Sequence, residues 1–121
     1  MARTRATMAQ DAKKGGNGRG TPPMPERQLQ ALVRLLALRL GYLHYHTHNS
    51  RRSEYGFPDS VIVKGSRLLF VELKSERGTL SVHQEVWLAT LRLVPRVEVY
   101  VWRPEAWYSC EIERVLRGEE G

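Results

Sequence analysis

The sequence predicts an α/β fold in which a mixed four-stranded sheet is flanked by helices. Two short aliphatic and β-branched runs, 60–63 and 67–71, are separated by a Gly-containing turn, which is typical of a β-hairpin. Leucines recur at helical spacing over 26–40, and a second helical pattern over 81–93 precedes a final strand over 97–102. This order of helix, three strands, helix and strand fits a mixed sheet with helices around it.

Length and composition indicate one small basic domain. The chain has 121 residues, 41% of them hydrophobic, which is enough for one core. We expect no membrane span, because no run of about 18 apolar residues exists, and no secretory signal, because no apolar segment follows the N-terminal arginines. The single cysteine, Cys110, favours a reducing, intracellular and cytoplasmic setting. The net charge of +6 indicates a polyanionic partner such as nucleic acid, or simply a soluble basic protein.

Residues 1–22 are expected to form a disordered basic tail, and residues 23–118 the folded domain. The tail is rich in glycine and poor in large apolar groups, so burial cannot offset the entropy lost on ordering. Against one acid, Asp11, it carries five cationic residues: Arg3, Arg5, Lys13, Lys14 and Arg19. The tail could add non-specific affinity for phosphates, or serve only as a solubility tail.

The first helix is expected from Glu26 to Leu40 and is followed by Gly41 as a stop signal. One face carries its apolar residues: Leu29, Leu32, Val33, Leu36 and Leu40. Glu26 lies in the first turn and projects toward this apolar side. A carboxylate at a helix N-terminus is sufficiently explained by the helix dipole.

A strand over 42–48 places His44, His46 and His48 on one face. Three histidines can suggest zinc, but ligands about 7 Å apart along one strand rarely converge on one ion. The polar loop that follows contains Arg51 and Arg52, whose guanidinium groups can bind phosphate bidentately. Ordinary solvated loop residues would explain this pair equally well.

The centre of the chain is Gly56-Phe57-Pro58-Asp59, followed in the next strand by Glu72-Leu73-Lys74. Strand alternation places Glu72 and Lys74 on one face, and Asp59 could lie beside Glu72 across the ladder. Carboxylate oxygens are ligands that Mg²⁺ prefers, and a nearby lysine can orient or deprotonate water or neutralise developing charge. The alternative is structural, because E-x-K is a common same-face salt bridge and Pro-Asp an ordinary turn.

In the second helix, Ser81 and Gln84 match a capping box, which accounts structurally for both residues. We expect Trp87, Leu88 and Leu91 to form the buried face of this helix. A terminal amphipathic stretch, 112–116, is expected to pack on the outside of the domain.

Together these motifs resemble the PD-(D/E)xK nuclease signature, and their order from Glu26 to Trp102 is similar to that of the VRR-NUC family. The short PD and ExK pattern is weakly specific, whereas the full order is specific. The chain resembles a stand-alone copy of this module, of the kind often carried by phages. The resemblance implies a restriction-endonuclease-like fold and a Mg²⁺-dependent DNA endonuclease, with Mn²⁺ able to substitute and with branched or structured DNA among the candidate substrates. A phage-encoded enzyme would act in the host cytoplasm.

The resemblance also implies roles for individual residues. Asp59, Glu72 and the backbone carbonyl of Leu73 would hold the metal, Lys74 would position or activate water, and Glu26 would complete the acidic shell. Gln84 would support the site, and the nucleic acid would lie near four residues: Tyr45, His46, Arg51 and Arg52. Two other functions stay open, a catalytically weak DNA-binding module and an RNA-cutting nuclease.

A homodimer is a further expectation, because nucleases of this fold often pair through a two-fold axis. The aromatic residues in and after the last strand are candidates for the interface: Tyr100, Trp102, Trp107 and Tyr108. Packing under the terminal helix would use them equally well.

Overall fold

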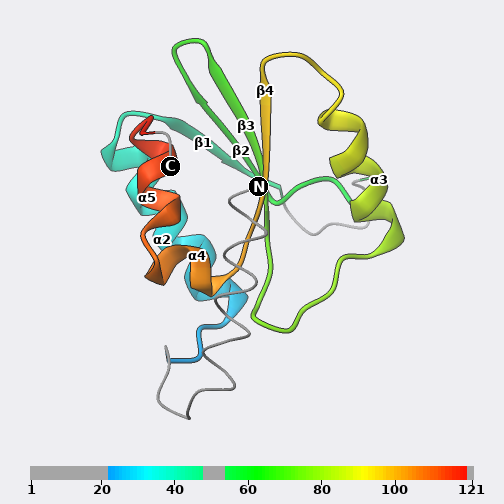
Figure 1. Cartoon of the computed structure of the whole chain (residues 1–121), viewed down its shortest axis with the longest axis horizontal. Helices are drawn as coiled ribbons and strands as arrows, with labels where there is room; N and C mark the ends of the chain where they lie inside the picture. The colour runs from blue at the N-terminus through cyan, green and yellow to red at the C-terminus, as the bar shows by residue number, and fades with distance from the viewer. Residues whose placement is uncertain (1–21, 48–53, 120–121) are drawn as a thin grey trace.

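A computed structural model of the chain describes residues 22–47 and 54–119. Most of the basic tail, His48, Arg51 and Arg52 lie outside the described residues. The described elements, in chain order, are α2 (Glu26–Arg39), β1 (Leu43–His46), β2 (Ser60–Lys64), β3 (Arg67–Leu73), α3 (Val82–Leu91), β4 (Val97–Trp102), α4 (Pro104–Tyr108) and α5 (Glu111–Leu116) (Figure 1).

The four strands form one sheet in the order β1-β2-β3-β4. The first two pairings are antiparallel, as expected for a hairpin with a preceding strand, and β4 joins β3 in parallel. A parallel neighbour requires a crossover connection, which α3 provides. The mixed four-stranded sheet predicted from the sequence is therefore confirmed.

The helices cover the two faces of the sheet unequally. Helices α2, α4 and α5 lie together on one side, and α3 lies on the other (Figure 1). The main core fills the three-helix side and is lined by alternate sheet residues, among them Ile62, Leu69, Val71, Leu73 and Trp102. Because side chains alternate along a strand, Phe70 and Glu72 then point toward the side of α3.

The predicted faces of the two long helices are largely confirmed. In α2 the fully buried residues are Leu29, Val33 and Ala37, at the spacing of one helical face. In α3 only Leu88 is fully buried, and the helix ends at Leu91. Among the described helices, α3 lies alone on its face of the sheet and buries a narrower apolar stripe than α2, which packs against the main core.

One of the aromatic residues expected at a dimer interface, Trp102, belongs to the core instead. Trp102 is completely buried, and the other three pack partly buried against the same cluster: Tyr100, Trp107 and Tyr108. The alternative of packing under the C-terminal helices is the arrangement found, with α4 as an element that the sequence pattern did not reveal. As an interface residue, Trp102 was therefore wrongly predicted.

One end of the sheet is tied together by Arg67, the first residue of β3. Its Nε and Nη2 donate to the two carboxylate oxygens of Glu98 on β4, at 2.8 and 2.6 Å. Its Nη1 donates to the Tyr42 hydroxyl and to the carbonyl oxygen of Val115 in α5. These hydrogen bonds join β3, β4 and α5 at the end of the sheet opposite Glu72. In the described part of the chain, no helix has both the length and the apolarity to cross a membrane.

Candidate active site

The candidate site lies where β2 and β3 stop pairing. The ladder between them ends at Ser60 and Val71. Beyond it, the Asp59 side chain takes the place of a strand, because its Oδ2 accepts the backbone N–H of Leu73 at 2.8 Å. Amide and carbonyl of one strand residue point to the same side, so the Leu73 carbonyl also faces Asp59. The sequence prediction that Asp59 lies close to the Glu72-Leu73-Lys74 stretch is therefore met in the structure.

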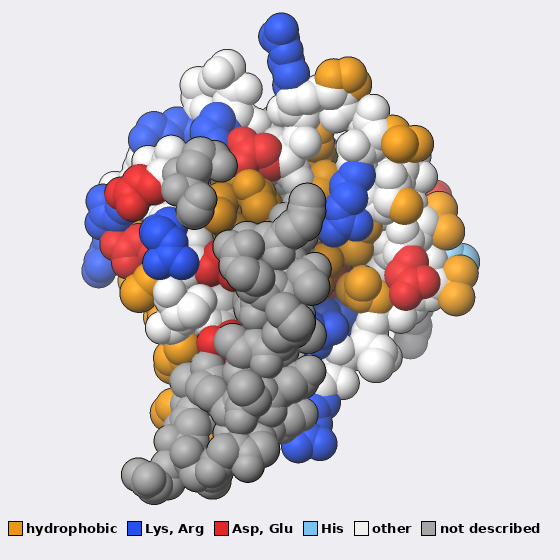
Figure 2. Space-filling view, viewed as in Figure 1, with side chains coloured by type: hydrophobic (Ala, Val, Ile, Leu, Met, Phe, Trp, Pro, Cys, Tyr) orange, Lys and Arg blue, Asp and Glu red, His pale blue; other side chains and the backbone are white. Residues whose placement is uncertain are grey.

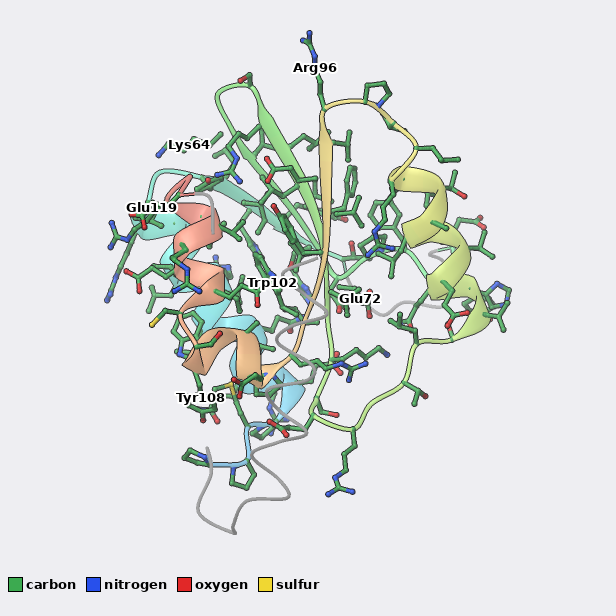
Figure 3. The ribbon with its side chains drawn as sticks, viewed as in Figure 1. Lys64, Glu72, Arg96, Trp102, Tyr108 and Glu119 are labelled. Atoms are coloured by element: carbon green, nitrogen blue, oxygen red, sulfur yellow. The ribbon has the colours of Figure 1, made fainter. Side chains whose placement is uncertain are left out.

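Glu72 is the buried carboxylate of the site, with 1% of its surface exposed. It lies on the α3 side of β3, whereas Trp102 lies on the three-helix side (Figure 3). Its Oε2 accepts a 2.8 Å hydrogen bond from Gln84 Nε2 and lies 3.9 Å from Lys74 Nζ. Its other oxygen, Oε1, is buried and has no hydrogen-bond partner among the described residues.

The surroundings of Glu72 favour its neutral form. Burial is the main cause. The negative charge of Asp59 and a hydrogen bond that protonated Glu72 can donate to Asp59 add to it, so the pKa of Glu72 rises to about 8 despite the opposing effect of Lys74. Burial likewise raises the pKa of Glu26 above its usual value, again with a contribution from Asp59. Glu26, Asp59 and Glu72 thus form one electrostatic group with Lys74, although they come from three different segments of the chain.

Gln84 reaches the site while it also caps α3. Its backbone N–H donates to Ser81 Oγ at 3.1 Å, and its Oε1 accepts the backbone N–H of Ser81 at 2.8 Å. The capping box predicted from the sequence is therefore confirmed. Because Oε1 is used by the cap, the amide nitrogen is directed to Glu72 Oε2. One side chain thus serves both the helix start and the carboxylate.

Lys74 is held at the point where β3 ends and a loop begins. Its backbone N–H donates to the carbonyl oxygen of Trp102 at 3.0 Å. The loop that follows is fixed by Arg103, whose Nη1 donates to the carbonyl oxygens of Ser75 and Gly78 at 2.8 and 2.6 Å. Arg103 follows β4 directly, and no local sequence signal indicated that it would contact this loop.

Of the residues expected near nucleic acid, the two that the structure describes, His46 and Tyr45, lie on opposite faces of β1. His46 Nδ1 lies 3.2 Å from the Asp59 carbonyl oxygen and 3.2 Å from Nε2 of Gln30. Tyr45 is 61% exposed and, by strand alternation, points to the opposite face of the sheet. The sequence analysis did not identify Gln30. Its position one helical turn after Glu26 could have indicated that it lies on the same side of the helix.

The donors of this site fit a hard divalent cation. Within the described ranges, no three His, Cys, Asp or Glu side chains are grouped so that they could hold a metal alone. A cation here would therefore need further ligands from water and phosphate oxygens, which is how Mg²⁺ is usually bound. The unpartnered Glu72 Oε1 and the neighbouring Asp59 carboxylate are the acceptors that such an ion requires.

Comparison with known proteins gives one informative match. No protein-family model matches the sequence, and no curated protein matches it. A solved structure described as a "VRR_NUC domain protein" superposes with a TM-score of 0.57 at 15% sequence identity, over 78% of this chain and 92% of that one. The chain has the fold of a VRR_NUC domain. At this identity the likeness concerns the fold, so function has to be argued from the site.

Proposed function

We propose that this chain is a divalent-metal-dependent nuclease that hydrolyses phosphodiester bonds in DNA. The observation that carries the proposal is the buried Glu72, with one unpartnered oxygen, beside Asp59 and Lys74. Burying a carboxylate in this way destabilises a fold, whereas a metal-dependent active site needs such a group. The VRR_NUC-like fold supports the same assignment.

In this proposal the chain's carboxylates bind Mg²⁺, with Mn²⁺ as a substitute. Asp59, Glu72 and the carbonyl of Leu73 are the ligands, and Glu26 completes the acidic shell. When bound, the ion supplies a water of lowered pKa and offsets charge on the phosphate oxygens. Gln84 keeps the Glu72 carboxylate in one orientation through its 2.8 Å hydrogen bond.

Lys74 is the proposed water-positioning residue. Its ammonium group lies 3.9 Å from Glu72 Oε2, at the edge of the same carboxylate group. A cation at this place can orient the attacking water, accept or relay its proton, or neutralise the charge that builds on the phosphate. His46, Tyr45, Arg51 and Arg52 remain the proposed contacts to the nucleic acid.

The test is cleavage of linear and branched DNA with Mg²⁺, with Mn²⁺ and with chelator. Asp59→Asn should abolish cleavage and keep the fold, because the asparagine oxygen can still accept the Leu73 N–H. A matched control is Glu113→Gln, since Glu113 lies on α5, its side chain is 44% exposed and it pairs with Arg117. Wild-type rates in Asp59→Asn would contradict the metal assignment.

The same experiment separates the two other functions. Binding of DNA without metal-dependent turnover would favour a binding module. Faster cleavage of a matched RNA would favour an RNA nuclease, since the phosphate chemistry does not itself distinguish the sugar.

The proposed homodimer cannot use the fully buried Trp102 as a contact. Exposed apolar residues on and just after α3 offer one, namely Val82, Val86 and Leu93, and hydrophobic side chains gather on that side of the molecule (Figure 2). Light scattering at micromolar concentration tests the dimer. A mass near the 13.9 kDa of one chain, with and without DNA, would exclude it.

A further inference from the structure

The loop before Asp59 lies directly against the first turn of α3. It meets the helix at Gly56, which has a positive φ of +88°. A Cβ atom at Gly56 would lie 2.5 Å from the carbonyl carbon of His83, 2.6 Å from its oxygen and 2.7 Å from the backbone nitrogen of Gln84. These are backbone atoms, so no side-chain rotation could make room for a Cβ.

Aromatic side chains hold the loop and the helix together on either side of Gly56. Trp87 Nε1, one helical turn further along α3, donates to the Tyr55 carbonyl oxygen at 3.1 Å. The Phe57 ring meets the Trp87 ring edge-on at a centroid distance of 5.0 Å and also lies against Phe70 of β3. The Tyr55 ring lies 5.8 Å from that of His83. The loop is therefore fixed to both α3 and the sheet.

Two residues of the candidate site lie next to this contact between the loop and α3, and they bind different partners. Gln84, whose backbone nitrogen faces Gly56, sends its side chain to Glu72 Oε2. Asp59, three residues after Gly56, binds the Leu73 amide. The separation of the loop from α3 therefore sets how far Gln84 stands from Glu72.

We propose that Gly56 is a positioning residue, which brings α3 close enough for Gln84 to hold the Glu72 carboxylate. A side chain at position 56 would push the first turn of α3 away from the loop and withdraw the Gln84 amide from Glu72. The catalytic consequence rests on the proposed nuclease function, whereas the positioning itself does not.

Other glycines of the chain provide the matched control. Gly118 has a φ of +80°, and, apart from its own residue and its chain neighbours, no atom of the described residues lies within 4 Å of the place that its Cβ would occupy. An alanine at Gly118 therefore meets the same backbone strain as one at Gly56 but meets no neighbour. The difference between Gly56→Ala and Gly118→Ala isolates the contact with α3.

The first experiment follows the Gln84 side-chain amide by NMR in metal-free protein, with the signal assigned by its loss in Gln84→Ala. We expect its protons to exchange slowly with water in wild type and in Gly118→Ala, and quickly in Gly56→Ala. Unchanged slow exchange in a folded Gly56→Ala would overturn the proposal. If Gly56→Ala does not fold, Trp87→Phe takes its place, because it removes the hydrogen bond to Tyr55 and keeps an aromatic, although smaller, ring against Phe57. Faster exchange in Trp87→Phe supports the proposal, and unchanged exchange overturns it.

The second experiment measures single-turnover cleavage with saturating metal and DNA. Gly56→Ala should slow cleavage on the order of 10²-fold, the effect expected for a misplacement near 1 Å. In a Gln84→Ala background the same substitution should change the rate within about twofold, because the group that it misplaces is already absent. Equal losses in both backgrounds would mean that Gly56 does not act through Gln84. If wild type cleaves nothing, the nuclease proposal fails while the amide exchange still decides the positioning role.

Discussion

At Glu72, burial gives the folded protein a proton that the unfolded chain would release. The pKa is about 8 in the fold, against a usual 4.5. Between these values the folded state binds more protons than the unfolded state, so the free energy of unfolding falls as pH rises through this window. Urea unfolding in chelator should therefore give a lower free energy of unfolding at about pH 8.5, above this window, than at about pH 5, near its lower end. Glu72→Gln should flatten this dependence.

The control for the pH experiment is Glu113→Gln, which should keep the wild-type slope because Glu113 is exposed. Glu98 does not interfere, since its hydrogen bond from Arg67 lowers its pKa. Its stabilising contribution is therefore complete throughout this window and is lost only in more acidic solutions. Stability that rises steadily toward alkaline pH in wild type would contradict the raised pKa of Glu72.

Lys74 allows a second prediction at the scale of one residue. Lys74→Ala should slow single-turnover cleavage by roughly 10²-fold, as expected when a proton-transfer or charge-stabilising group is lost. Divalent-ion affinity, measured by calorimetry, should change little. Lys64→Ala is the matched control, because Lys64 is exposed at the far end of β2 and donates to the Leu40 carbonyl (Figure 3). If Lys74→Ala loses divalent-ion affinity but cleaves at the wild-type single-turnover rate at saturating metal, Lys74 is a structural residue.

Among the elements, the loop after β3 depends on Arg103. Arg103→Ala removes the hydrogen bonds to the Ser75 and Gly78 carbonyls and should destabilise the fold by about 1–3 kcal/mol. Because this loop continues directly from Lys74, cleavage by the folded variant should also slow. Thermal melting and single-turnover rates measure the two effects.

Arg67→Ala is the comparison for Arg103→Ala, since Arg67 also ties elements together but at the opposite end of β3. It should lower stability by a similar or larger amount, because four hydrogen bonds are lost. The cleavage rate of the folded fraction should stay near wild type. Equal slowing in both variants would mean that the loop has no special link to Lys74.

Elements with a strong local signal could be predicted from the sequence. The hairpin, the leucine face of α2 and the capping box depend on residues close together in the chain. Helix α4 has only five residues, which is too short for a helical spacing of apolar residues to be recognised in the sequence. The burial of Trp102 could not be read from its neighbours either, because it depends on where α4 and α5 return to the sheet.

The candidate site shows the same division. Asp59, Glu72 and Lys74 were found because strand alternation and the hairpin bring them together. The family resemblance implied that Gln84 supports the site, but not that it contacts Glu72, and the geometric cause of that contact lies in the close approach of the loop to α3 at Gly56. Arg103 contacts a loop far away in the sequence, so no local pattern could have revealed it. Gln30, in contrast, could have been found from its place one helical turn after Glu26.

At the scale of the whole molecule, positive charge is distributed unevenly along the chain. Seven of the 19 Lys and Arg residues, but only two of the 13 Asp and Glu residues, lie outside the described ranges. On the described surface, cationic and anionic side chains are intermixed (Figure 2). The excess charge available for a polyanion is therefore concentrated in residues 1–21 and 48–53.

Deleting residues 1–20 should make DNA binding less sensitive to salt. The deletion removes five Lys or Arg residues, and each phosphate contact contributes about 0.9 to the slope of log affinity against log salt. Fluorescence anisotropy with Asp59→Asn protein avoids cleavage during the titration. An unchanged slope would mean that the tail does not contact phosphates, and substitution of Arg51 and Arg52 in the same assay would then test the loop.

The hydrogen bond from the Leu73 amide to Asp59 has a consequence for observing the site. A backbone N–H in a sheet is normally protected by the neighbouring strand, but this one is protected by a side chain that is also a proposed metal ligand. The rate of deuterium uptake at the Leu73 amide therefore reports, without any added probe, whether the Asp59 side chain keeps this hydrogen bond. In Asp59→Ala the Leu73 amide should exchange at the rate of an open edge, whereas Val71, which lies within the β2–β3 ladder, should stay protected.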